Sequence, residues 1–98
     1  MSKYVKKDQW VWVVVQEPGR DEHFLGIEDE KRGESFIPVF LQKEEAQQGL
    51  NHLPLEKEMK YEVQAIRLNN LATDAAQKGF MVFVLNGSGE VLEKIKSK

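Results

Sequence analysis

The chain has 98 residues and a formal net charge of −2, with 41% hydrophobic and 31% charged residues. This composition predicts one globular domain over residues 1–98, with residues 1–8 as a frayed tail, and it excludes an intrinsically disordered chain. The absence of cysteine excludes disulfides and thiolate chemistry, and no apolar run is long enough for a membrane span, so the sequence predicts a cytoplasmic protein.

The first predicted element is a strand over Trp10–Val15, "WVWVVV". Side chains alternate between the two faces of a strand, so Trp10, Trp12 and Val14 share one face, while the valines between them share the other. Both faces are apolar. The strand therefore needs cover on both sides.

Two further strands follow turns that are rich in charge and glycine. Residues 23–28, "HFLGIE", predict a short strand in which Gly26 marks a bulge or a close approach. Residues 35–41, "SFIPVFL", predict a third strand. Pro38 has no N–H to donate, so this strand lies at an edge, is bulged at Pro38, or lacks a pairing partner there.

The hydrophobic period changes over residues 42–53, where Ala46, Leu50 and Leu53 recur at helical spacing. This pattern predicts a helix that Gly49 weakens and Pro54 ends. Residues 60–68, "KYEVQAIRL", alternate apolar and polar side chains. They predict a strand with one solvated face.

The last third of the chain predicts a helix, a strand and a hairpin. Asn69 or Asn70 would cap a helix that runs to Lys78, with Gly79 as its left-handed C-terminal residue. Residues 80–85, "FMVFVL", form a strand that is apolar on both faces. The "NGSG" that follows predicts a tight turn, and residues 91–96 return as a strand or, alternatively, as a C-terminal helix.

The predicted order βββαβαββ is that of an α+β fold: one mixed or antiparallel sheet of five or six strands with two helices on one face. Two helices on one face leave the other face of an apolar sheet uncovered. Large apolar patches on soluble proteins usually mark interaction sites. The sequence therefore predicts a non-enzymatic interaction or homodimerisation module, whose interface lies on the helix-free face and contains Trp10, Trp12, Val14 and Phe83, or Val84 in another register.

Three alternatives to this homodimer remain open. Loops could seal the tryptophan face within one monomer, the partner could be a different protein, or an apolar small ligand could occupy the face. The lysines near both chain ends keep those ends soluble or form a weak anion-binding patch. A slightly acidic chain argues against nucleic acid as the partner.

The sequence carries no motif for catalysis, cofactor binding or metal binding. His23 and His52 have no second ligand at metal-binding spacing, and neither Ser35 nor Ser88 stands in a nucleophile elbow. We therefore predict no enzyme activity, cofactor or metal. The alternative function is a small-molecule or enzymatic site between sheet and loops, to which His23, Tyr61, Glu62 or Arg67 would contribute.

The order of several short motifs resembles that of a family of small proteins found mostly in cyanobacteria and plastids. These motifs are Gly26-Ile27, "VFLQKEEAQQGL", "VQAI" and "KGF", within residues 10–85. The strand-to-helix piece is also similar to the amino-terminal domain of a secretion-associated bacterial family. The resemblance implies an α+β fold. It assigns no activity and carries over no site residue.

Overall fold

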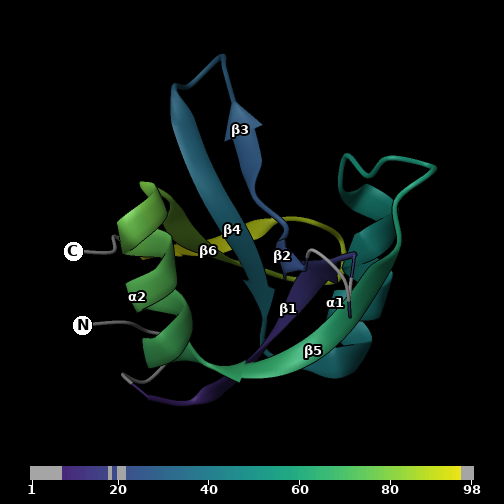
Figure 1. Ribbon diagram of the computed structural model, residues 1–98, viewed down its shortest axis with the longest axis horizontal. Helices are drawn as coiled ribbons and strands as arrows, with labels where there is room; N and C mark the ends of the chain where they lie inside the picture. The colour runs from purple at the N-terminus through teal and green to yellow at the C-terminus, as the bar shows by residue number, and fades with distance from the viewer. Residues whose placement is uncertain (1–7, 18, 20–21, 96–98) are drawn as a thin grey trace.

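A computed structural model describes residues 8–17, 19 and 22–95 of the protein (Figure 1). The predicted α+β fold is confirmed, because the described residues form a mixed sheet of seven strands with two α-helices. In chain order the elements are β1 (Trp10–Gln16), β2 (His23–Phe24), β3 (Ile27–Asp29), β4 (Glu34–Phe40), α1 (Lys43–Gly49), a 3-10 turn (Leu50–His52), β5 (Tyr61–Arg67), α2 (Leu68–Lys78), β6 (Met81–Leu85) and β7 (Val91–Ile95).

Five strands follow the spatial order β2-β1-β4-β6-β7, while β5 pairs with β1 and β3 pairs with β4. The β4–β6 pair is parallel and the others are antiparallel. Direct pairing of β1 with β4 covers two positions, Trp12 and Val13 of β1. Beyond them β2 and β3 fill the space between the two strands, and the N–H of Leu25 donates to the carbonyl of Val14 (2.9 Å).

The α2 face of the sheet carries the β-branched side of β1. Val11, Val13 and Val15 pack there with Leu71 and Ala75 of α2, and all five are buried. The small Ala75 lets the helix lie close to the strands. This face agrees with the predicted grouping of the three valines.

The opposite face is covered by α1, so the prediction that both helices share one face is wrong. Ala46 of α1 is buried in a second core with Val14, Phe40 and Phe83. Leucines of the segment after α1 complete this core: Leu50, Leu53 and Leu55. In Figure 1, α1 and α2 lie on opposite sides of β1. The physical reason is that β1, β4 and β6 are apolar on both faces, and two helices on one face would leave the other to water.

Two predictions concern the segment between β1 and α1: the strand over residues 23–28 with its Gly26, and the position of Pro38. The strand predicted over 23–28 divides into β2 and β3. A Cβ on Gly26 would lie 2.8 Å from the Phe80 ring, so the predicted close approach is confirmed.

Pro38 lies in a part of β4 that pairs with β6 alone. β3 stops pairing with β4 at Phe36, and β1 begins to pair with β4 at Val39. This is the third arrangement expected for a strand proline.

The ends of α2 follow the prediction at one end only. Gly79 adopts the left-handed conformation (φ 79°) and closes the helix, as expected. The predicted asparagine cap is wrong, because α2 begins at Leu68, directly after β5, with Arg67 at the N-cap and no side-chain cap bond. The N–H of Leu68 still bonds to the carbonyl of Gln9 (2.8 Å), so the sheet satisfies this helix end.

The predicted hairpin is confirmed, and residues 91–95 form a strand, not a helix. The Asn86 side-chain oxygen accepts the N–H groups of Ser88 (3.0 Å) and Glu90 (2.9 Å). The left-handed residue of this turn is Gly89 (φ 84°). The turn is therefore held by the asparagine side chain.

The predicted features of the chain ends fall mostly outside the described residues. Of the tail predicted over 1–8, the structure describes Asp8, whose carboxylate lies 3.0 Å from Arg67. Of the terminal lysines, it describes Lys94, which pairs with Glu34 (3.0 Å). Both interactions hold described residues against the sheet.

Candidate functional site

The four side chains predicted at an interface do not share one exposed surface. Val14 and Phe83 are 0% and 2% exposed, packed beneath α1 in the second core. Their burial inside the protomer corrects the expectation that they contact a partner. Trp12 is partly buried, whereas Trp10 is 59% exposed. The tryptophan end of β1 is therefore the accessible part of the predicted interface.

Each tryptophan ring at this end of β1 lies close to a positively charged side chain of the same protein. The Arg67 guanidinium lies 5.4 Å from the Trp10 ring centroid, and the Lys43 ammonium lies 5.8 Å from that of Trp12. The Asp8 carboxylate forms an ion pair with the same Arg67 guanidinium, at 3.0 Å. These contacts cover one face of each ring and leave most of Trp10 in water.

Strand β5 forms an open edge of the sheet beside Trp10. It pairs with β1 along all seven of its residues, and no other described strand pairs with it. Its ladder contains no proline, and the register with β1 is continuous. A long regular edge of this kind offers unpaired backbone groups to another strand.

Two hydrogen bonds that flank β5 show which backbone groups face outward. The N–H of Glu17 donates to the carbonyl of Lys60 (2.9 Å) before the strand. The N–H of Leu68 donates to the carbonyl of Gln9 (2.8 Å) after it. Both pairs continue the β1–β5 register. Since bonding groups alternate sides along an antiparallel ladder, Tyr61, Val63 and Ala65 direct both N–H and C=O away from β1. Arg67 directs its N–H outward as well, but its C=O belongs to the N-cap of α2 and accepts a bond within that helix.

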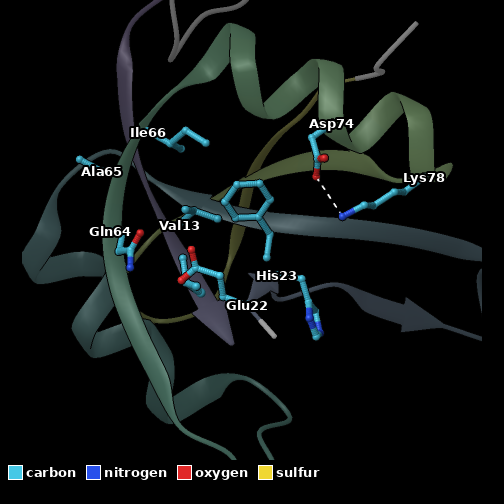
Figure 2. A pocket seen from close by; sticks show the side chains of 10 residues that line it. Val13, Glu22, His23, Gln64, Ala65, Ile66, Asp74 and Lys78 are labelled. Carbon is cyan, nitrogen blue, oxygen red and sulfur yellow. Dashed lines mark ion pairs between the residues drawn. The ribbon is translucent and has the colours of Figure 1, made fainter. Parts of the chain in front are cut away.

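A separate pocket of about 290 Å³ opens on the α2 face, between α2, β5 and the start of β2 (Figure 2). Its apolar wall comes from three strands and contains Val13, Val15, Phe24, Ala65 and Ile66. Its polar lining comes from α2, β5 and the residues that lead into β2: Glu22, His23, Gln64, Asp74 and Lys78.

The structure brings one of the four predicted ligand-site residues to this pocket. His23 lines it, and the His23 ring lies 3.1 Å from the Gln16 amide nitrogen. Tyr61, Glu62 and Arg67 do not line it. The Tyr61 hydroxyl accepts the N–H of Glu56 (2.9 Å), so this side chain belongs to the opposite face.

Sequence reasoning missed Asp74 and Lys78, the two charged groups that α2 supplies. Lys78 Nζ lies 3.3 Å from Asp74 Oδ2, one helical turn away. Their spacing of four residues on a helix was a signal for this ion pair. Which elements would face the pair could not be read from that spacing, because Glu22 and His23 come from a distant part of the chain.

The described residues contain no group of three or more histidine, aspartate or glutamate side chains that could together hold a metal ion. Neither described helix is long and apolar enough to cross a membrane.

Compared with family models, curated proteins and solved structures, the chain matches none of them. The resemblance to the cyanobacterial and plastid family stays a prediction.

Proposed function

We propose that the protein is a non-enzymatic interaction module that forms a homodimer by pairing β5 of one copy with β5 of another. The observation that carries this proposal is the outward row of backbone groups at Tyr61, Val63 and Ala65, which the N–H of Arg67 extends. Strands that add to an exposed edge gain their binding energy from such groups. The cysteine-free sequence is consistent with the cytoplasmic location that we propose with it.

A two-fold axis at Gln64 gives the pairing that uses the whole edge. In this antiparallel register Tyr61 of one copy lies opposite Arg67 of the other, and Val63 lies opposite Ala65. Val63 and Ala65 then exchange both backbone hydrogen bonds across the axis, and the N–H of Arg67 donates to the C=O of Tyr61, in both copies. The two sheets become continuous across the axis.

The exposed Trp10 ring also supports the strand edge of β5 as the dimer interface. Trp10 lies opposite Arg67 in the β1–β5 register, at one end of the open edge. In the proposed dimer, Tyr61 of the second copy approaches Arg67 and extends the aromatic contact at Trp10. Tryptophan is the residue type most enriched among the energetic centres of interfaces, and its burial removes apolar area from water.

The contact is small. One strand edge of seven residues and one indole bury less than the roughly 800 Å² per partner of a stable complex. We therefore expect a weak dimer with a dissociation constant of about 10–500 µM. Its formation will depend on the protein concentration.

Ala65→Pro should abolish the dimer and leave the protomer folded. Proline removes an N–H that faces outward, so the β1–β5 bonds are kept and the partner's bond is lost. The measurement is sedimentation equilibrium over a range of concentrations, with near-ultraviolet circular dichroism to confirm folding. Trp10→Ala should weaken the dimer to a smaller extent.

The matched control is Ala65→Val, which keeps the N–H and suits a strand, so that dimer formation should persist. A wild-type chain that stays monomeric at the highest accessible concentration would rule out self-pairing. Dimers of unchanged affinity in Ala65→Pro would show that another surface is used.

A further inference from the structure

The α2 pocket contains a carboxylate oxygen that the protein leaves incompletely satisfied. Asp74 Oδ2 is shielded from solvent and accepts no hydrogen bond from the described residues. Lys78 Nζ lies 3.3 Å from it, so the charges are paired, but the contact does not have hydrogen-bond geometry. A buried acceptor without a donor is unfavourable. The Asp74 side chain as a whole is still 33% exposed, so a cation in the pocket can approach the exposed part of this carboxylate.

The charge of the pocket lining favours a cationic donor. Two carboxylates, Asp74 and Glu22, face it together with one ammonium, that of Lys78. Figure 2 shows Asp74 pointing from α2 toward the pocket, with Glu22 on the opposite side. The Lys78 side chain is 50% exposed and the Asp74 side chain 33%, so solvent screens the lysine charge more than the carboxylate charge.

The wall that adjoins these charges is apolar. Val13 and Val15 are 0% and 3% exposed, and Phe24 and Ile66 pack against the same core. The volume of about 290 Å³ lies at the lower end of the range for ligand pockets, about 300–1,000 Å³. The space suits a compact apolar body the size of a phenyl or branched alkyl group.

We propose that this pocket binds a small molecule that carries an ammonium group on an apolar body. The ammonium pairs with the exposed part of the Asp74 carboxylate, and the body lies against Phe24 and Ile66, which are only partly buried. Free apolar amino acids and simple amines share this chemistry. In an amino acid, the carboxylate would in addition face Lys78. Binding uses the α2 face and does not require the pairing of β5.

The test is a titration of the ¹⁵N-labelled protein followed by heteronuclear NMR, with three ligands that share a phenyl ring. Phenethylamine has the ammonium alone, L-phenylalanine has both charges, and 3-phenylpropionate has the carboxylate alone. We expect the two ligands with an ammonium to shift amide signals at Val13, Ile66 and Asp74. Tighter binding of L-phenylalanine would identify the amino-acid class, and tighter binding of phenethylamine the amine class.

Two variants separate recognition by Asp74 from general attraction. Asp74→Asn should weaken phenethylamine binding by about tenfold or more, because the amide lacks the charge that the ammonium needs. Lys78→Met should tighten it, since the competing cation is removed. Glu44→Gln on α1 is the control, because it makes the same charge change as Asp74→Asn on the opposite face of the sheet and should have no effect.

Three results would overturn the assignment. They are no saturable shift with any ligand up to about 20 mM, equal binding of 3-phenylpropionate and phenethylamine, and unchanged phenethylamine affinity in Asp74→Asn. Ala65 lines the pocket as well as the strand edge, so the ligand titrations use proteins in which Ala65 is unchanged, and the two proposals are tested on different variants.

Discussion

Phe40→Ala should lower the free energy of unfolding by about 3–5 kcal/mol, the usual cost of removing a fully buried phenylalanine. Phe40 is 0% exposed and is among the largest fully buried side chains of the protein. Its ring lies in the second core, beneath α1. Its loss leaves a cavity that the short helix cannot fill by collapse, because the sheet holds the strands in place. Urea denaturation at concentrations too low for dimer formation measures this change.

The control for Phe40→Ala is Trp10→Ala, which removes a larger aromatic side chain from the same sheet. Trp10 is 59% exposed and contacts the Arg67 guanidinium, so its removal should cost less than about 1 kcal/mol. Equal losses in the two variants would contradict the assignment of Phe40 to the core and Trp10 to the surface. Hydrophobicity alone would rank the two residues in the opposite order.

Gly49→Ala should destabilise the protein by about 1–3 kcal/mol, the range for overpacking a core. Helix propensity predicts the opposite sign, because alanine is favoured over glycine by about 1 kcal/mol inside a helix. Gly49 has an ordinary helical φ of −62°, so its conformation does not require glycine. A Cβ at this position would lie 2.5 Å from two atoms of the Phe40 ring. Steric conflict with a buried ring should outweigh the gain in propensity.

The double variant Phe40→Leu/Gly49→Ala tests the cause of that loss. Leucine lacks the outer ring atoms, so in the Phe40→Leu background the added methyl group should be neutral or stabilising. The two effects are then non-additive, as expected for residues in contact. If Gly49→Ala alone raises the urea midpoint, the Phe40 ring gives way and the close approach does not determine the choice of glycine.

Several elements could be predicted because local patterns specify them. The period-2 alternation of residues 10–15 separated the three valines from Trp12 and Val14, and the structure places these groups in different cores. Gly79 ends α2, and the turn at Asn86 returns the chain into β7. In each case neighbouring residues carry the information.

The candidate sites could be predicted only in part. The sequence named Trp10 as one of four interface residues and His23 as one of four residues of an alternative ligand site. Of these, Trp10 is 59% exposed and His23 lines the α2 pocket. It did not indicate the open edge of β5, because the outward direction of a backbone group depends on the register with β1. It did not join Asp74 to Glu22 either, since α2 and the start of β2 meet only after the sheet has formed.

Taken by itself, the amino-acid sequence determined the α+β class, the positions of most strands and helices, and which side chains of a strand lie together. Side-chain periodicity and turn chemistry act over a few residues, so these features can be read directly. The tertiary structure alone decided that α1 and α2 cover opposite faces, which buries Val14 and Phe83 and leaves Trp10 and the β5 edge in water. That choice follows from a comparison of apolar area on both sides of an assembled sheet, a quantity that no single segment contains.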